Sequence, residues 1–229
     1  MLNKLFEKYD SIIFIDTETT GLDFKNDKII ELSAVKTVCP DGKIIITDKL
    51  DDFILLPFGM KIPPEVENLT GITNEILGAE GIAPSEVCGK FADLFTDKKI
   101  LVVAYNAQFD MNFIYYFLKE NGRTDILKRI NMLDAYTIYR DRHDYPHRLE
   151  NAIEQYNLSE KVQNSHRAID DTLALIEVLK AMDSEYSDLE KYINLFGYNP
   201  KYGISGSKIS SVTYKPQSYE RIIKLYEQN

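Results

Sequence analysis

The stretch SIIFIDTETTGL, residues 11–22, joins an apolar run to a polar turn and decides how the rest of the chain is interpreted. Residues 11–16 are predicted to form a short buried strand, with Asp16 and Glu18 at its exit. Side chains two residues apart on a strand point to the same face, so the two carboxylates are expected to lie together. Taken alone, this pair is better explained by a solvated strand end followed by a turn.

The remaining pattern predicts a mixed α/β sheet. Residues 27–38 and 42–50 are rich in β-branched side chains and are separated by the turn triplet Pro40-Asp41-Gly42, which indicates an antiparallel pair. A buried strand is expected over 99–107 and a shorter one just before Asp134. Helices are predicted over residues 63–69, 84–95, 109–120, 134–140, 147–158 and 167–183.

Two further acids and one histidine follow predicted strands or begin predicted helices. Asp110 lies in AYNAQFD after the strand at 99–107, and His166 and Asp171 lie five residues apart in HRAIDD. If the last long helix begins near residue 167, Asp171 lies one turn inside it, and Asp170 points about 100° away. Each residue alone has an ordinary explanation, such as a helix-start acid favoured by the helix dipole.

The acids become informative as a set. Four carboxylates at one sheet edge would repel one another unless cations filled the cluster. Mg²⁺ and Mn²⁺ prefer oxygen ligands, and cations held in this way are suited to phosphoryl transfer. The pattern therefore predicts a metal site built from Asp16, Glu18, Asp110 and Asp171.

In this order and spacing, the motifs resemble those of the DEDDh family of 3′→5′ exonucleases. The matching segments are FIDTETTGL, NAQFD and HRAIDD, and KIIELSAVK and LTGIT are also similar to family segments. The resemblance covers roughly residues 10–182. It implies a ribonuclease-H-like α/β fold, with a mixed five-stranded sheet flanked by helices. It also implies two divalent cations, Mg²⁺ or Mn²⁺, and hydrolysis of the 3′-terminal phosphodiester to nucleoside 5′-monophosphates.

The resemblance also implies a role for each matching residue. Asp16 would contact both cations, and Glu18 and Asp171 would complete the site that holds the attacking water. Asp110 would hold the second cation through water, and His166 would act as general base, since an ordinary histidine pKa near ~6.5 suits that task.

Substrate contacts are implied as well. The expected contacts with the terminal nucleotide and its base are Thr19, Thr20, Gly21, Leu69, Thr70, Gly71, Ile72, Thr73, Asn106 and Phe109. Tyr105 departs from the histidine common in the family, which puts only local contacts in doubt. Glu31 and Asp134 match family-like positions, and buried supporting or helix-capping roles are expected for them. His147 is expected to be structural and His143 exposed.

The DEDDh resemblance leaves the substrate open. The chain looks most like proofreading epsilon-type subunits and polymerase-linked exonuclease domains, so single-stranded DNA 3′ ends are expected, with a polymerase or another replication or repair protein as partner. Ribonuclease T and oligoribonuclease share the site, and no residue can be assigned to reading a 2′-hydroxyl. A haloacid-dehalogenase-type phosphatase is disfavoured by Glu18 and His166. A binding module without activity is disfavoured because every acid is present.

Composition limits the other function classes. The net charge of -9 argues against a protein that coats nucleic acid non-specifically.

The positive charge is concentrated at the C-terminal end. Residues 191–229 carry six lysines and arginines against two acids, so the net charge of this tail is +4 and that of residues 1–190 is -13. We expect an exonuclease domain over 1–182 and a basic extension over 183–229. The extension would pack on the domain, bind single strands through its tyrosines, or dock on a partner. Core-facing helix residues are expected at Ile193, Leu195 and Phe196.

Cysteine and hydropathy patterns indicate the compartment. Cys39 and Cys88 form neither a disulfide framework nor a zinc site, so two reduced thiols are expected. No apolar run approaches the ~18 residues of a membrane span, and the first ten residues lack the pattern of a signal peptide. A cytoplasmic location with no membrane partner is expected.

Overall fold

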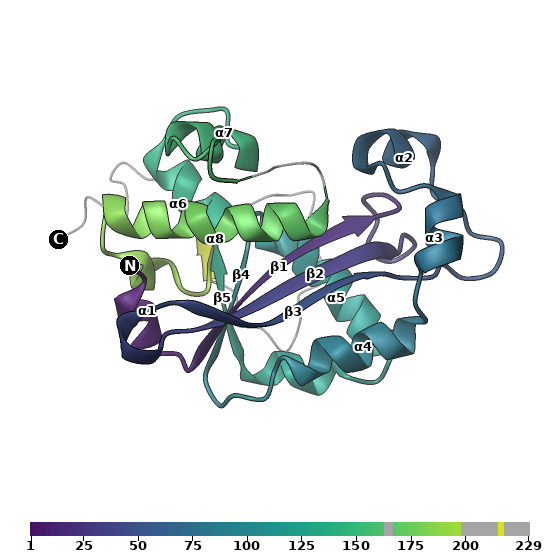
Figure 1. The fold of residues 1–229 in the computed structure, drawn as a ribbon, viewed down its shortest axis with the longest axis horizontal. Coiled ribbons are helices and arrows are strands. Elements are labelled where there is room, and N and C mark those ends of the chain that lie inside the picture. The colour runs from purple at the N-terminus through teal and green to yellow at the C-terminus, as the bar shows by residue number, and fades with distance from the viewer. Residues whose placement is uncertain (163–166, 198–214, 218–229) are drawn as a thin grey trace.

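The computed structural model describes residues 1–162, 167–197 and 215–217 (Figure 1). Its centre is a five-stranded sheet in the order β3-β2-β1-β4-β5. β1, β2 and β3 pair antiparallel, whereas β4 and β5 run parallel to β1, so the predicted mixed sheet is confirmed. The strands are β1 Ser11–Thr19, β2 Ile29–Val38, β3 Ile45–Phe53, β4 Ile100–Ala104 and β5 Ile130–Asp134.

Helices cover both faces of this sheet (Figure 1). They are α1 Asn3–Phe6, α2 Pro64–Thr70, α3 Asn74–Glu80, α4 Pro84–Asp93, α5 Ala107–Glu120, α6 Ala135–Arg142, α7 Leu149–Gln155 and α8 Ala168–Glu185. Proline occupies the first position of α2 and α4, where its missing N–H costs no hydrogen bond. α5 ends at the predicted stop, because Gly122 adopts a φ of 70° that ordinary residues avoid. Three-residue to six-residue 3₁₀ turns lie at Pro40–Gly42, Thr124–Arg129 and Leu189–Tyr192.

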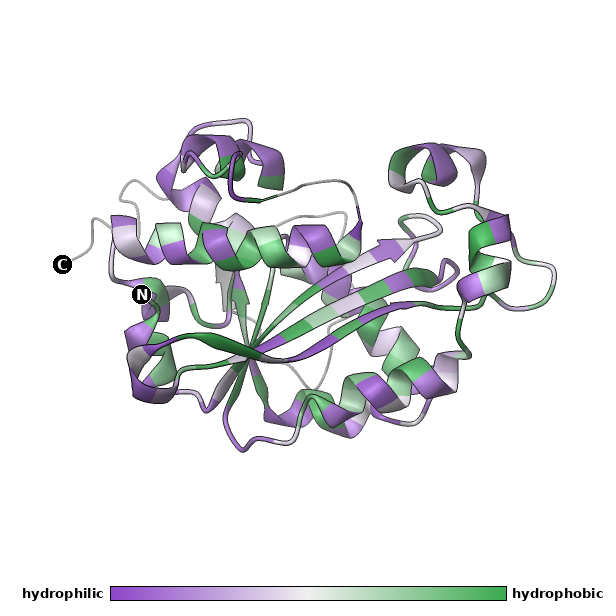
Figure 2. Ribbon diagram, in the orientation of Figure 1, coloured by the Kyte–Doolittle hydropathy of each residue, from purple (hydrophilic) through white to green (hydrophobic). Residues whose placement is uncertain are grey.

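Alternation along β1 divides the core into two layers. Ile13 and Ile15 pack with the buried residues of α4 and α5, whereas Ile12 and Phe14 pack with those of α8. Apolar residues accordingly gather on the central strands, and the edge strand β3 is hydrophilic over much of its length (Figure 2). Every even-numbered residue of β1 from 12 onward therefore faces α8, and this register positions the site described below.

The chain beyond α8 does not form the predicted helix. Leu189 and Tyr192 are buried in the core under α8, and Asn194 hydrogen-bonds both ways with the backbone of Met132 on β5. Asn194 has a φ of 60°, so its left-handed conformation turns the chain away from a helical path. The expected helix is therefore wrong: Ile193 follows a 3₁₀ turn and Leu195 begins a short strand. Ile193 does pack, partly buried, against the core, while the side chain of Phe196 lies outside the described residues.

This short strand, β6 Leu195–Gly197, pairs in parallel with β7 Lys215–Gln217. The proposed domain boundary at residue 183 falls inside α8, and residues as far as Asn194 pack on the same core as α8. The existence of a separate extension stays a prediction, since most of residues 198–229 lie outside the described part of the chain. Cys39 and Cys88 are unpaired thiols.

Candidate active site

β1 and α8 bring three of the predicted acids together. Asp16 and Glu18 lie on the face of β1 that α8 covers, and Asp171 lies in the first turn of α8. One carboxylate oxygen from each of the three residues lies within 4.8 Å of the others. Asp170 is outside this group and lines, with Glu177, a separate cavity between α8 and the segment that joins β2 to β3. The geometry selects Asp171, the acid that the five-residue spacing from His166 selected; the helix angle alone indicated only that one of the pair would join the cluster.

The fourth acid reaches the cluster from the other side of the sheet. Asp110 is almost fully buried in the first turn of α5, and its Oδ1 accepts a hydrogen bond of 2.8 Å from the Thr17 hydroxyl. Thr17 lies between Asp16 and Glu18 and points to the opposite face of β1. Acids from α8 and from α5 therefore lie on opposite faces of β1 around one strand end, and Thr17 fixes the acid from α5.

Glu31 sets where α8 begins. Its carboxylate is fully buried on β2 and accepts hydrogen bonds from Arg167 at 3.0 and 2.8 Å. Its second oxygen accepts the backbone N–H of Ala168 at 3.0 Å, which satisfies one of the unpaired amides at the helix start. The Arg167 guanidinium also lies 4.8 Å from the ring of Phe53. These contacts fix the first turn of α8 and with it Asp171.

Asp134 has a comparable role for α5 and α6. Its carboxylate accepts hydrogen bonds from the backbone N–H groups of Asn106, Ala107 and Tyr136 and from the hydroxyl of Thr137. It thus caps α6 and fastens the start of α5, the helix that carries Asp110. The helix-capping role expected for Asp134 is confirmed.

Burial and mutual repulsion raise the pKa values of the clustered acids. Burial, followed by the charges of Asp171 and Glu31, raises the pKa of Glu18 to about 8. Burial raises the pKa of Asp110 and of Asp171 to about 7 each, although the Thr17 hydrogen bond opposes the shift at Asp110. Burial and the neighbouring acids, Asp110 first, raise the pKa of Asp16 well above its usual range. Acids in this environment favour either protons or cations.

The carboxylate oxygens of the acidic cluster are suitable ligands for divalent cations. Asp171 Oδ1 is buried and has no hydrogen-bond partner among the described residues, whereas the nearby Glu31 is fully paired. A buried carboxylate oxygen without a donor is costly unless a cation approaches it. Converging carboxylate oxygens are the ligands that Mg²⁺ and Mn²⁺ favour. The cluster can therefore hold such ions and, through them, act on a phosphodiester.

The loop after β1 holds the residues expected to meet a terminal nucleotide. The Thr19 hydroxyl donates to the Gly21 carbonyl at 2.6 Å, and the Thr20 hydroxyl donates to Asp27 at 3.1 Å. A β-carbon at Gly21 would collide with the Asp27 carboxylate and displace it from its hydrogen bonds with Thr20 and the Asp23 amide. The loop is thus ordered by its own contacts next to the acidic cluster.

The segment Leu69–Thr73 divides between surface and core. Leu69 is 61% exposed at the end of α2, whereas Thr70 and Ile72 are buried. Gly71 has a φ of 71° where α2 ends, and the Thr73 hydroxyl caps α3. Of this segment, Leu69 alone has an exposed apolar side chain, and the remaining residues shape the turn.

The residues around motif two are placed at the start of α5. Asn106 adopts a φ of 69° immediately before the helix, and Phe109 packs on Phe113 with ring centroids 5.0 Å apart. The Tyr105 hydroxyl donates to the backbone carbonyl of His147 at 2.8 Å. Tyr105 therefore joins the end of β4 to the segment before α7. His166, the expected general base, lies outside the described residues.

Two contributors were missed in the sequence. Thr17 could have been assigned from strand alternation, because it must face away from the two acids. Arg167 carried no comparable signal, since its partner Glu31 is 136 residues away. His143 was expected to be exposed, but it is half-buried, with its Nε2 3.0 Å from the Tyr156 hydroxyl.

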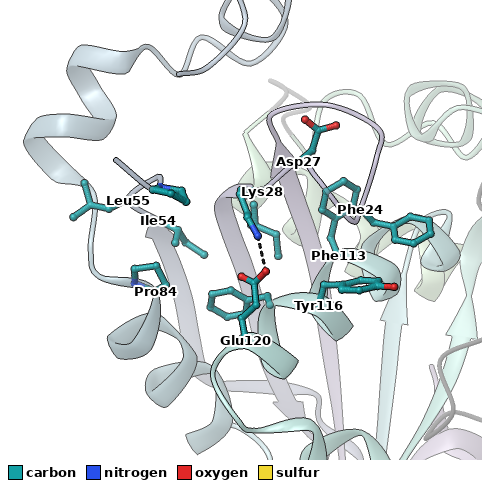
Figure 3. Close-up of a pocket in the computed structure, with 12 residues that line it drawn as sticks. Phe24, Asp27, Lys28, Ile54, Leu55, Pro84, Phe113, Tyr116 and Glu120 are labelled. Atoms are coloured by element: carbon teal, nitrogen blue, oxygen red, sulfur yellow. Dashed lines mark hydrogen bonds and ion pairs between the residues drawn. The ribbon is translucent and has the colours of Figure 1, made fainter. Parts of the chain in front are cut away.

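A second cavity, drawn in Figure 3, lies on the α5 side of the sheet and contains none of the four acids. It has a volume of about 110 Å³ and a largely apolar lining. Phe24 stacks on Tyr116 at its rim, and the Lys28 ammonium pairs with Glu120 at 2.5 Å. Its charged lining residues are Asp27, Lys28 and Glu120, and the pairing of Lys28 with Glu120 neutralises two of them.

Comparison with known proteins gives a family match over most of the chain. The exonuclease family model matches residues 13–179. A DNA polymerase III of PolC type from Clostridium perfringens is 34% identical over 171 residues, covering 75% of this chain and 11% of that protein. The chain thus spans about a tenth of the length of this relative. The DNA polymerase III subunit epsilon of Treponema pallidum is 29% identical over 197 residues, covering 80% of this chain and 82% of that protein.

Solved structures share the fold. Escherichia coli Exonuclease I in complex with a dT13 oligonucleotide superposes with a TM-score of 0.68 at 20% identity, over 80% of this chain and 43% of that chain. Exonuclease I from Methylocaldum szegediense gives 0.66 at 21% identity, over 78% and 41%. Both confirm the expected sheet with flanking helices. Among the described residues, no helix is both long and apolar enough to cross a lipid bilayer.

Proposed function

The chain belongs to the exonuclease family, and we propose that it hydrolyses the 3′-terminal phosphodiester of single-stranded DNA in a metal-dependent reaction. The products are nucleoside 5′-monophosphates. The observation that carries this proposal is the convergence of Asp16, Glu18 and Asp171 within 4.8 Å, with Asp110 joined to the same strand through Thr17. Family membership argues against the phosphatase alternative.

The four acids divide the work of holding two cations, Mg²⁺ or Mn²⁺. Asp16, which lies between acids from both faces of the sheet, would take part in holding both ions. Glu18 and Asp171 would complete the site for the first ion, and Asp110 would serve the second. When bound, the cations supply an activated water and stabilise charge on the attacking and leaving oxygens.

Other residues of the chain orient the reactants. Thr19, Thr20 and Gly21 form a loop ordered by its own hydrogen bonds, which would position the terminal sugar, and the exposed Leu69 would meet its base. Arg167 and Glu31 keep the first turn of α8, and so Asp171, against β1. His166, five residues before Asp171, is the proposed general base that takes the proton of the attacking water.

DNA is the proposed substrate rather than RNA. The two relatives named above are DNA polymerase III proteins, and the Escherichia coli structure holds a deoxyoligonucleotide. By the same reasoning, we propose a DNA polymerase or another replication or repair protein as partner. The expected cytoplasmic location stays a prediction.

The test compares 5′-labelled single strands of DNA and RNA of identical sequence, with Mg²⁺, with Mn²⁺ and with EDTA. Stepwise shortening from the 3′ end of DNA, release of 5′-monophosphates and arrest by EDTA are expected. Faster degradation of RNA than of DNA would show that RNA is the preferred substrate, and it would leave the proposed metal-dependent hydrolysis unchanged. Failure to shorten either strand with any divalent cation would contradict the proposed activity.

A further inference from the structure

A solvent-open cavity of about 530 Å³ lies between the start of α5, the helix α6 and the segment leading into α7. This volume falls within the ~300–1,000 Å³ typical of ligand sites. Its lining includes Asn106, Tyr136, Arg140, Tyr145, His147 and Arg148.

The lining of this cavity differs in charge from the linings of three other cavities formed by the described residues. The chain carries 36 acids against 27 lysines and arginines, yet no carboxylate lines the cavity. The cavities beside α5, beside α8 and at the end of α6 each include at least two acids. Two arginines, one histidine and three tyrosines are thus concentrated at one place in an acidic protein. Cations next to aromatic rings suit phosphates and stacked bases.

The cavity combines a fixed wall with two projecting groups. Arg140 donates to the Tyr136 hydroxyl at 3.2 Å and lies 6.0 Å from its ring, and the Tyr105 hydroxyl fastens His147. Tyr145 is 87% exposed. The Arg148 side chain is 83% exposed, and its contact with Glu150, 3.5 Å long, is a surface pair that contributes little. A tyrosine ring and a guanidinium therefore extend from an ordered wall into solvent.

Residues that are close in sequence connect the cavity to the acids. Asn106 lines the cavity and immediately precedes α5, and Asp110 lies in the first turn of that helix. Four helical residues correspond to a rise of about 6 Å. A single strand whose 3′ end reaches the acids has a short path from there to the cavity.

We propose that this cavity is a second nucleotide-binding subsite that holds the single strand upstream of the bond being cleaved. Tyr145 stacks on a base, and Arg148, with Arg140, receives the backbone phosphates. We identify the ligand as a single strand with its 3′ end at the acids, and this identification rests on the proposed function. The subsite changes how strongly long substrates bind and leaves the chemical step to the acidic cluster.

The test compares a substrate of one nucleotide with a substrate of twelve nucleotides. The 5′-p-nitrophenyl ester of thymidine monophosphate contains one nucleotide and cannot enter the subsite, whereas the oligonucleotide dT12 can. In Tyr145→Ala, the KM for dT12 should rise roughly 5- to 150-fold, the range for loss of one stacked base. Its kcat on dT12 and its kinetics on the p-nitrophenyl ester should stay within twofold of wild type. Tyr145→Phe keeps the ring and should behave like wild type.

Arg148→Ala tests the phosphate contact. The slope of log K against log salt for dT12 should become shallower by about 0.7, the value for one phosphate contact on a single strand. Lys128→Ala is the matched control, because this exposed lysine precedes β5 at the opposite end of the sheet. Its salt slope and KM should match wild type.

The outcomes separate the subsite from the activity. Unchanged dT12 kinetics in both Tyr145→Ala and Arg148→Ala would overturn the subsite while leaving the exonuclease proposal standing. Equal loss on both substrates would overturn it too, because it would place these residues in the terminal site. If wild type degraded nothing, fluorescence anisotropy with labelled dT12 would still decide: binding weakened by Tyr145→Ala supports the subsite, and binding unaffected by it overturns the proposal.

Discussion

Glu18 on β1 and Glu31 on β2 lie directly opposite each other across the antiparallel pair, yet the fold treats the two carboxylates differently. Like charges in this position destabilise a sheet unless something compensates them. Glu31 is compensated within the chain by Arg167 and the Ala168 amide. Glu18 keeps a pKa raised to about 8 by burial and its acidic neighbours. Hydrogen bonds within the chain therefore satisfy the Glu31 carboxylate, whereas the Glu18 carboxylate is available to bind a cation.

Stability should fall with rising pH in metal-free protein. Folded protein keeps protons on Glu18, Asp110 and Asp171 up to pH 7–8, whereas the unfolded chain releases them near ~4. The folded state thus binds more protons in this window, and the free energy of unfolding decreases from about pH 5 to about pH 8. Thermal unfolding in EDTA at half-unit pH steps checks this sign.

Mg²⁺ should reverse that loss. At pH 8 the cation replaces the protons and should raise Tm more than at pH 5.5, where protons compete for the same oxygens. Asp171→Asn removes one titrating group and one proposed ligand. It should therefore reduce both the fall of Tm with pH in EDTA and the rise of Tm that Mg²⁺ produces. A Tm that rises with pH across this window in EDTA would show that the cluster does not hold its protons as described.

Removing the two partners of the Arg167–Glu31 pair should have unequal effects. Arg167→Met leaves the buried Glu31 charge without its cation and should cost about 3–5 kcal/mol, the range for stranding a buried charge. Glu31→Gln keeps an acceptor for Ala168 and leaves an arginine that is 39% exposed and can turn to water, so about 1–2 kcal/mol is expected. Urea unfolding measures both, and equal costs would mean that Arg167 does not compensate Glu31.

Tyr192 should be part of the folded body. Its side chain is fully buried, its hydroxyl donates to Asp141 at 2.7 Å, and the buried Arg142 guanidinium lies 5.6 Å from its ring. Tyr192→Ala should cost about 3–5 kcal/mol, and Tyr192→Phe about 1 kcal/mol for the hydroxyl. Phe58→Ala, at a fully exposed ring, is the control and should change stability by less than about 0.5 kcal/mol.

A related test concerns the chain after α8. Truncation after Ser187 removes Leu189 and Tyr192 from the core and should lower Tm strongly. A truncated protein that melts like the full chain would show that these residues contribute little to the folded body.

Local geometry was predictable from the sequence, and long-range pairing was not. Asp16 and Glu18 were assigned to one face because strand alternation depends only on residues two apart. Asp171 was distinguished from Asp170 by the five-residue spacing from His166 together with the angle between adjacent helix positions. Both rules act within a single element, so no tertiary information was needed.

The missed contacts all depend on how distant elements meet. The Thr17–Asp110 hydrogen bond joins residues 93 apart, and the Arg167–Glu31 pair joins residues 136 apart. The left-handed turn at Asn194 was also unpredicted, because the propensity of the apolar residues around it favoured a helix and contacts with β5 overrode that preference. Polar cavities formed by three elements, such as the one beside α6, leave no periodic signal in sequence.

The most direct test of the central claim measures single-turnover cleavage of 5′-labelled dT12 with saturating Mg²⁺ by wild type, Asp171→Asn and Asp170→Asn. The two variants change adjacent residues by the same chemistry, but only Asp171 lies in the acidic cluster. The rate should fall at least ~10³-fold in Asp171→Asn, because a proposed carboxylate ligand of the catalytic cations is lost. Asp170→Asn should retain most of the wild-type rate. Near-normal cleavage by Asp171→Asn, or greater loss in Asp170→Asn, would contradict a reaction carried out at the cluster of Asp16, Glu18 and Asp171.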